Sequence, residues 1–188
     1  MEEYKQIVDL PAPRPTQTPT SWKPPPTDCY KINVDGAMFK EIGQCGIRVV
    51  VRNDRGEIMG ALSKKLYFPL GALEAEAKAM ECGIIFAWEL GLRQVIIEGD
   101  SQVVIQALKC ETPAPISIQQ VITRAKMWLP TFTSWETSFT WRNNNVAAHL
   151  MAKHAKDVID CMIWVEDTSP IIIPQILSDV LSMGTTHV

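Results

Sequence analysis

The chain has 188 residues, 46% hydrophobic and 21% charged, which is enough for one domain with a buried core but too few for two full domains. Its net charge of -3 and its isoelectric point near 5.6 exclude a basic field around the whole molecule that would collect nucleic acid nonspecifically. No uninterrupted apolar run approaches the roughly 18 residues of a transmembrane helix, so a soluble protein is expected.

The five cysteines are scattered and include no C-x-x-C pair. This argues against a disulfide framework or a zinc site and favours a reducing compartment. The first ten residues, MEEYKQIVDL, carry acidic side chains where a signal or transit peptide needs basic ones. We therefore expect an intracellular protein of the nucleus or cytoplasm, most simply a monomer, with neither a membrane nor a disulfide partner.

A proline-rich leader opens the chain, because seven of the 13 prolines lie before residue 27. Proline has no N–H to donate, so residues 1–29 are expected to be extended and flexible. Regular patterning begins at Tyr30. We expect one domain over residues 30–160, followed by a C-terminal extension of unknown role over residues 161–188.

Three strands are expected first. Residues 31–35 alternate polar and apolar side chains, residues 46–52 (GIRVVVR) are largely β-branched, and a third run covers residues 57–68 after the turn Asn53-Asp54-Arg55-Gly56. Short connections join them, which predicts an antiparallel meander.

Helices then alternate with single strands. Apolar residues repeat every three or four positions over residues 72–90, and Gly91 is the expected end of that helix. Residues 95–99 form a short apolar strand, expected to be parallel to the first. Further helices are expected from Ser101 to Leu108 and over residues 118–129 and 146–158, with a last strand over residues 139–141. The order predicts an α/β fold whose five-stranded mixed sheet, antiparallel first and then parallel, is flanked by helices.

Carboxylates lie where burial alone would not place them. Asp35 and Asp100 each follow an apolar stretch at the end of a strand, and Glu74 and Glu76 lie at the start of the long helix. Neighbouring strands would bring the two aspartates together at the edge of the sheet where ligands bind, with a helix carboxylate facing them. Such a cluster is tolerated when a cation neutralises it, and hard oxygen ligands favour Mg²⁺ or Mn²⁺. Two such ions suit phosphodiester hydrolysis.

Each carboxylate also has a simpler interpretation. Aspartate at a strand end is common as a turn or capping residue, and glutamate in a first helical turn complements the helix dipole. The combination of the three positions in one strand and helix order is what favours a metal site.

Four sequence blocks together resemble the catalytic blocks of type 1 ribonuclease H, in the form related to plant and retrotransposon reverse transcriptases. The resemblance covers about residues 22–158 and includes the leader block Trp22-Lys23-Pro24-Pro25-Pro26. The four blocks are Val34-Asp35-Gly36-Ala37, Ala75-Glu76-Ala77-Lys78-Ala79, Glu98-Gly99-Asp100-Ser101, and the stretch from Asn145 to Lys153.

The resemblance implies that Asp35, Glu76 and Asp100 are catalytic metal ligands, and it selects Glu76 over Glu74. It implies cleavage of the RNA strand of an RNA–DNA hybrid with Mg²⁺ or Mn²⁺, two ions being expected and one possible. One position departs from the family pattern. His149 stands where the family has a fourth metal-binding aspartate, so the site loses one negative charge, although an imidazole can still coordinate Mn²⁺ or act as an acid or base.

Substrate contacts are expected from residues around these blocks. Gly43 and Gln44 occupy the place of a family loop that touches the RNA strand, and Arg142 is either a phosphate contact or a surface cation. Gly36, Ser101 and Asn145 complete the expected substrate-binding set. By contrast, Trp128, Trp135 and Trp141 are expected to pack rather than stack on bases.

Two functions follow from these features. The first is a metal-dependent endonuclease acting on RNA–DNA hybrids. The second is a catalytically weak or inactive ribonuclease H-like module that binds nucleic acid or a protein partner. His149 is the residue that separates them.

Overall fold

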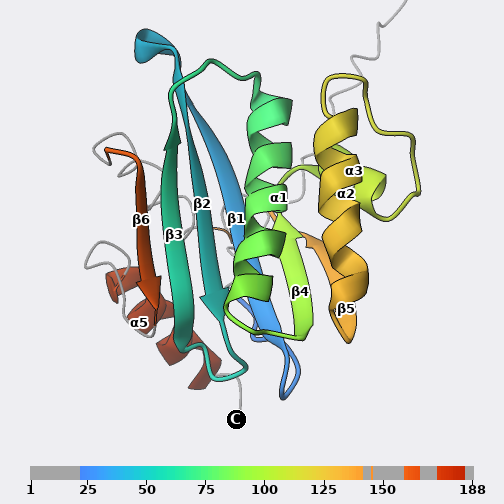
Figure 1. Ribbon diagram of the computed structural model, residues 1–188. Helices are drawn as coiled ribbons and strands as arrows, with labels where there is room; N and C mark the ends of the chain where they lie inside the picture. The colour runs from blue at the N-terminus through green and yellow to red at the C-terminus, as the bar shows by residue number, and fades with distance from the viewer. Residues whose placement is uncertain (1–21, 142–144, 146–158, 166–172, 185–188) are drawn as a thin grey trace, which may run out of the picture.

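The computed structural model describes residues 22–141, 145, 159–165 and 173–184. Six strands form one mixed sheet in the order β5-β4-β1-β2-β3-β6 (Figure 1). The strands are β1 (Tyr30–Phe39), β2 (Gln44–Arg52), β3 (Ile58–Leu66), β4 (Gln94–Gly99), β5 (Ser134–Phe139) and β6 (Cys161–Val165). The helices are α1 (Ala72–Glu89), α2 (Gln102–Leu108), α3 (Gln119–Trp128) and α5 (Ile173–Gly184).

The pairing pattern confirms the predicted α/β class and mixed sheet. β1, β2 and β3 form an antiparallel meander, whereas β4 runs parallel to β1 and β5 runs parallel to β4. Because β1 lies between an antiparallel and a parallel neighbour, it is central to the sheet. The carboxyl half of β1 therefore lies between the antiparallel strand β2 and the parallel strand β4.

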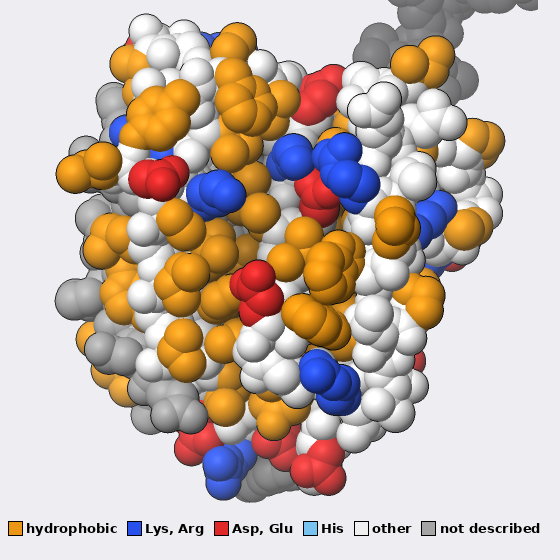
Figure 2. Space-filling model, viewed as in Figure 1, with side chains coloured by type: hydrophobic (Ala, Val, Ile, Leu, Met, Phe, Trp, Pro, Cys, Tyr) orange, Lys and Arg blue, Asp and Glu red, His pale blue; other side chains and the backbone are white. Residues whose placement is uncertain are grey.

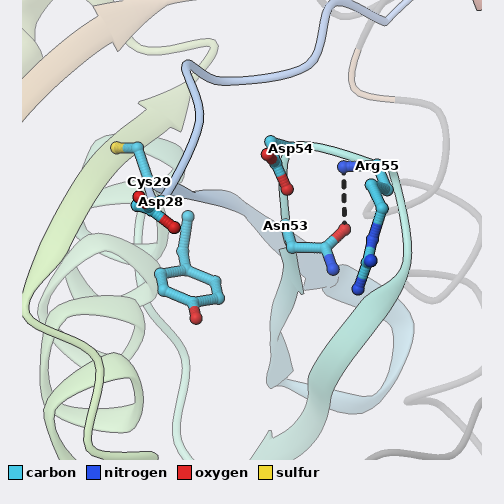
Figure 3. Close-up of a pocket in the computed structure, with 6 residues that line it drawn as sticks. Asp28, Cys29, Asn53, Asp54 and Arg55 are labelled. Carbon is cyan, nitrogen blue, oxygen red and sulfur yellow. Dashed lines mark hydrogen bonds between the residues drawn. The ribbon is translucent and has the colours of Figure 1, made fainter.

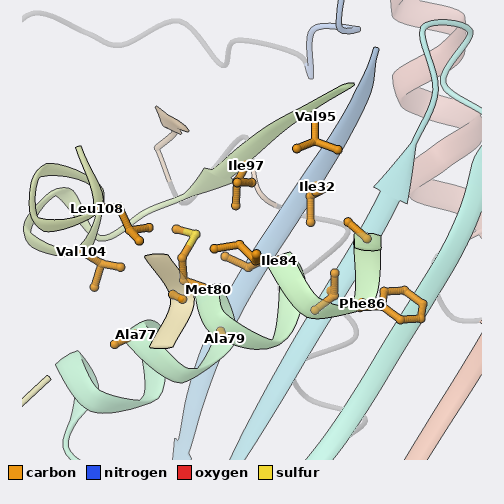
Figure 4. Close-up of a cluster of buried hydrophobic side chains, with 14 of the residues drawn as sticks. Ile32, Ala77, Ala79, Met80, Ile84, Phe86, Val95, Ile97, Val104 and Leu108 are labelled. Atoms are coloured by element: carbon orange, nitrogen blue, oxygen red, sulfur yellow. The ribbon is translucent and has the colours of Figure 1, made fainter. Parts of the chain in front are cut away.

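The core lies between α1 and the sheet (Figure 4). Ile32, Val34 and Ile97 are buried beneath Met80 and Ile84 of the helix. Alanine and glycine make up five of the nine buried residues of α1, so the helix packs close to the sheet. The approach is close at Gly83, where an added Cβ would lie 2.5 Å from Cγ1 of Val34. A larger residue there would force the helix outward.

The opposite face of the same strands is polar. Period-two alternation places Asn33, Asp35, Arg48 and Arg52 on the face opposite to that of Ile32 and Val34. All four are buried. Trp22 and the helix α5 cover part of this face, because Arg52 lies 3.7 Å from the centre of the Trp22 ring and donates a hydrogen bond to Oδ2 of Asp179 (2.7 Å).

Two sequence predictions need correction. The sheet has six strands, not five, because residues 161–165 pair antiparallel with β3 at the edge of the sheet. The last parallel strand is Ser134–Phe139 rather than residues 139–141. Its register is set by β4, since Gln94 pairs with Ser134 and Gly99 with Phe139, so the strand is complete before the predicted one begins.

The predicted helix over residues 146–158 lies outside the described residues. None of the described helices has the length and apolar character required to cross a membrane.

Candidate active site

Three carboxylates meet where β1 and β4 part. The parallel pairing of these strands ends at Asn33 and Glu98. Asp35 lies two residues after Asn33, and Asp100 lies two residues after Glu98. Glu76, in the second turn of α1, completes the group. Ligand oxygens of Asp35, Glu76 and Asp100 all lie within 4.8 Å of one another. The structure thus brings together the three residues that the sequence singled out, and the group contains Glu76 rather than Glu74.

Gly36 makes this meeting sterically possible. A Cβ at this position would lie 2.5 Å from the carbonyl carbon of Ala75 and 2.8 Å from the backbone nitrogen of Glu76. Both contacts are to backbone, so no side-chain rearrangement could relieve them. The missing side chain therefore lets the first turns of α1 lie against β1, which places Glu76 beside Asp35. The predicted contact of Gly36 with the substrate stays a prediction.

A buried arginine lies beside the carboxylates. Arg48 is directly opposite Asp35 in the β1–β2 ladder, and its Nη1 is 3.6 Å from Oδ2 of Asp35. Arg48 is fully buried and Asp35 is 1% exposed. Burial lowers the pKa of Arg48 to about 9, opposed by the charges of Asp35 and Glu76, so the guanidinium remains charged at neutral pH. Arg48 lies outside the sequence blocks that predict the site.

Asn145 is held against β1. It is 2% exposed, and its Nδ2 donates a hydrogen bond to the backbone oxygen of Val34 (2.8 Å). This bond places the start of the fourth sequence block one residue from Asp35 in β1. His149 and Arg142, the other predicted residues of that block and its preceding loop, lie outside the described residues.

The remaining predicted substrate contacts lie around the cluster rather than in it. Gly43 and Gln44 lie at the β1–β2 connection, roughly 13 Å along the strand from Asp35 at about 3.3 Å per residue. Gly43 has a φ of 60° and open space where a Cβ would lie. Ser101 precedes α2 as its N-cap, but its side chain makes no capping hydrogen bond.

The prediction that Trp135 and Trp141 pack inside is wrong. Their exposed fractions are 36% and 57%. Trp141 contacts Phe139 edge to face with ring centroids 5.2 Å apart. Phe139 is the last residue of β5 and is paired with Gly99, the residue before Asp100. The aromatic pair therefore lies at the end of β5 that is nearest to the carboxylates.

A separate hollow lies at the other end of β1, lined by Asp28, Cys29, Tyr30, Asn53, Asp54 and Arg55 (Figure 3). Its polar groups are largely used in the turn itself. Oδ1 of Asn53 accepts hydrogen bonds from the backbone nitrogens of Arg55 (3.0 Å) and Glu57 (2.9 Å). Tyr30 opens the strand on which Asp35 lies five residues later, so the hollow is distinct from the carboxylate cluster.

The face covered by α1 and α3 presents no continuous basic strip (Figure 2). Its lysine and arginine side chains are few and lie among apolar and acidic ones. Some are engaged within the fold, as where Arg124 and Lys78 both bind Glu81. Among the described residues, the basic side chains of this face are therefore isolated from one another.

The donor set of the cluster fits a hard divalent cation. Three carboxylate oxygens within 4.8 Å suit Mg²⁺ or Mn²⁺, which prefer oxygen ligands, and no histidine or cysteine joins them among the described residues. Asp35 would be the buried ligand, while Glu76 and Asp100 are half-buried and border solvent. The cluster thus combines one fully buried carboxylate with two that are partly exposed.

Comparison with solved structures shows which fold this is. The chain is similar to ribonuclease H1 of the archaeon Halobacterium salinarum, with 22% identity and a TM-score of 0.64 over 69% of this chain and 98% of the other. It is also similar to an N-terminal ribonuclease H domain from Mycobacterium tuberculosis (19% identity, TM-score 0.63, 69% and 94% covered). A third similar structure is a ribonuclease H1 from compost, solved in complex with an RNA/DNA hybrid (16% identity, TM-score 0.62, 68% and 96% covered).

A search among curated proteins gave no significant match. The model of the reverse transcriptase-like family, in contrast, matches residues 33–155, well over half of the chain. The match runs from β1 through β5 and includes all three clustered carboxylates. The chain therefore belongs to the reverse transcriptase-like family and contains a ribonuclease H-like domain.

Proposed function

We propose that this domain is a metal-dependent endonuclease that hydrolyses the RNA strand of RNA–DNA hybrids. The observation that carries the proposal is the convergence of Asp35, Glu76 and Asp100, whose oxygens lie within 4.8 Å, in a chain of this family. The similar compost enzyme, solved with an RNA/DNA hybrid, supports the choice of substrate.

The three carboxylates would hold Mg²⁺ or Mn²⁺. When bound, such an ion supplies positive charge at the scissile phosphate and lowers the pKa of a water molecule. Asp35 provides a buried oxygen whose position is set by the β1–β2 ladder and by Arg48. Glu76 and Asp100 provide oxygens at the solvent boundary, where a phosphate can approach.

The exposed pair of Phe139 and Trp141 supports a nucleic-acid substrate. Aromatic side chains at a strand end beside a nuclease site can stack on a base or a sugar. The pair lies next to Asp100 through the β4–β5 pairing, and both rings are more than one third exposed. Because the whole chain is acidic, we expect hybrid binding to depend on this edge and on the bound ion rather than on a broad basic surface.

A cleavage assay tests this proposal. The full chain is incubated with a hybrid labelled on its RNA strand, in Mg²⁺, in Mn²⁺ and in EDTA. We expect cleavage with an ion and none in EDTA, and a loss on the order of 100-fold or more for Asp35→Asn, Glu76→Gln or Asp100→Asn. Glu74→Gln is the matched control, because Glu74 lies on the same helix outside the cluster, and it should cleave like the wild type.

His149 favours a second candidate function. With histidine at the fourth ligand position, the domain would bind nucleic acid or a protein partner with little or no hydrolysis. The same assay with His149→Asp separates the two candidates. If the natural sequence cuts nothing with either ion while His149→Asp does, the domain is a binding module and the nuclease proposal fails.

A further inference from the structure

Asn33 and Glu98 form a buried hydrogen bond across the last paired position of β1 and β4. The parallel register of the two strands ends at this pair, and Nδ2 of Asn33 donates to Oε1 of Glu98 (2.8 Å). Asn33 is 0% exposed and Glu98 is 7% exposed. The bond therefore links the two strands at the point where their backbone pairing stops.

Both side chains are held in place by further partners. Oδ1 of Asn33 accepts hydrogen bonds from Nε1 of Trp22 and from Nη2 of Arg52, each 3.2 Å long. Oε2 of Glu98 lies 3.2 Å from Nζ of Lys31. A flip of the Asn33 amide would turn its NH₂ group toward the two donors. Only the orientation in which this amide donates to Glu98 therefore satisfies all of these groups.

This polar network is more costly than packing requires. Asn33, Glu98 and Lys31 are all buried, and buried ion pairs often stabilise a fold no more than apolar residues of similar volume. The place of the network gives another reason for it. Two residues further along the strands lie Asp35 and Asp100, two of the three clustered carboxylates, and the β1–β4 register does not extend to them.

We propose that Asn33 and Glu98 are positioning residues of the metal site, whose hydrogen bond sets the separation of β1 and β4 from which Asp35 and Asp100 reach the ion. This inference rests on the proposed function, because it assumes that these carboxylates bind a divalent ion. Glu98 is not a member of the cluster, so it acts through the strand. Loss of the outer partners of metal ligands typically lowers metal affinity by roughly 10–100-fold.

Two substitutions at Glu98 isolate the hydrogen bond. Glu98→Gln and Glu98→Met both remove the negative charge and keep a similar volume, but only glutamine offers a carbonyl oxygen that accepts the bond from Asn33. Mn²⁺ binding to the full chain is measured by titration calorimetry. We expect Glu98→Met to bind Mn²⁺ at least about tenfold more weakly than Glu98→Gln. Equal affinities of the two variants would overturn the proposal.

Trp22→Ala separates positioning from stability. This variant removes one of the two donors to Oδ1 of Asn33, but Arg52 remains as the other and the bond to Glu98 is kept. Its thermal midpoint should therefore fall while its Mn²⁺ affinity stays that of the wild type. If Trp22→Ala loses as much Mn²⁺ affinity as Glu98→Met, the effect is a general loss of stability and the proposal falls.

Asn33→Ala breaks the same bond from β1 and repeats the test if Glu98→Met does not fold. It leaves the charge of the chain unchanged and should also weaken Mn²⁺ binding about tenfold or more. Wild-type affinity in a folded Asn33→Ala variant would overturn the proposal. So would a failure of both variants to fold, because the bond would then be required by the fold as a whole.

The failure of this inference is distinguishable from the failure of the proposed function. If Asp35→Asn abolishes Mn²⁺ binding while Glu98→Met binds like Glu98→Gln, the metal site stands and only the role of the bond between Asn33 and Glu98 falls. If the wild type binds no Mn²⁺, the proposed function fails and this inference falls with it.

Discussion

Two arginines on β2, four residues apart and on the same face of the sheet, are buried in different ways. Arg52 donates hydrogen bonds to Asp179 (2.7 Å) and to Asn33 (3.2 Å) and stacks on Trp22. Arg48 has only the 3.6 Å ion pair with Asp35 and no hydrogen-bond acceptor among the described residues. Both terminal nitrogens of Arg52 thus have acceptors, and only its Nε has none, whereas all three nitrogens of Arg48 lack one.

The difference indicates two roles for buried charge in one sheet. Arg52 joins three segments that are distant in sequence, namely the stretch at Trp22, the central strands and α5. Arg48 joins nothing and instead faces a carboxylate cluster. Buried polar groups without hydrogen bonds are expected mainly at functional sites, because elsewhere they lower the stability of the fold and contribute nothing to function.

The largest effect is expected for Arg52→Met. The substitution removes the bonds to Asp179 and Asn33 and leaves the Asp179 carboxylate buried without its arginine, which should cost about 3–5 kcal/mol in the free energy of unfolding. Denaturation in urea measures this. Arg55→Met, which breaks an exposed pair with Glu57, is the control and should cost less than about 1 kcal/mol. Equal effects for the two variants would contradict the role given to Arg52.

The next largest effect is expected for Trp22→Ala. Trp22 is 3% exposed, and its Nε1 donates a hydrogen bond to Oδ1 of Asn33 (3.2 Å). Loss of the ring should lower the free energy of unfolding by about 3 kcal/mol, through lost burial and lost stacking on Arg52. The Mn²⁺ affinity should not change. A weaker affinity would show that the two arginines are not independent.

Gly36→Ala should affect both stability and the metal site. Its new Cβ would collide with the backbone of Ala75 and Glu76, so α1 must move away from β1, at about 1–3 kcal/mol. Because Glu76 moves with the helix, Mn²⁺ affinity should fall about tenfold or more. The control is Gly43→Ala, where the space is open and only the positive φ is strained. If Gly36→Ala binds Mn²⁺ like the wild type, the close approach is not what forms the cluster.

The smallest effect is expected at Glu81, a carboxylate of α1 that is paired within the fold. Burial raises its pKa, but hydrogen bonds from Arg124 and Lys78 outweigh this, and the net pKa is lowered. Glu81→Gln should therefore cost about 1 kcal/mol at neutral pH. A lowered pKa in the folded state means that this contribution is present above the unfolded pKa near 4.5 and disappears as the pH falls through the folded value. A difference between wild type and variant that grows in acid would contradict this.

Much of this fold was predictable because its signals are local. Alternation in β1 and β2 and the three- and four-residue repeat of α1 identify the elements, and the positions of Asp35, Glu76 and Asp100 at their ends predict where the carboxylates meet. β6 was missed because it pairs with β3, about 100 residues earlier in the chain, and no local pattern records that partner.

The surroundings of the site were less predictable. By its own sequence, Arg48 is one residue of a largely apolar strand. The signal for its role is the register of the β1–β2 hairpin, because counting back across the hairpin places Arg48 opposite Asp35. The exposure of Trp141 depends on where β5 ends, which is set by pairing with β4 rather than by its own sequence. Side-chain environment is a property of the register, and register is decided by distant strands.

The most direct measurement for the account as a whole is the anomalous diffraction of a crystal soaked in Mn²⁺. The proposed metal site predicts a strong anomalous peak coordinated by oxygens of Asp35, Glu76 and Asp100, with Arg48 beside the buried ligand. A crystal with no anomalous peak among these three carboxylates, at Mn²⁺ concentrations that support or should support cleavage, would contradict it.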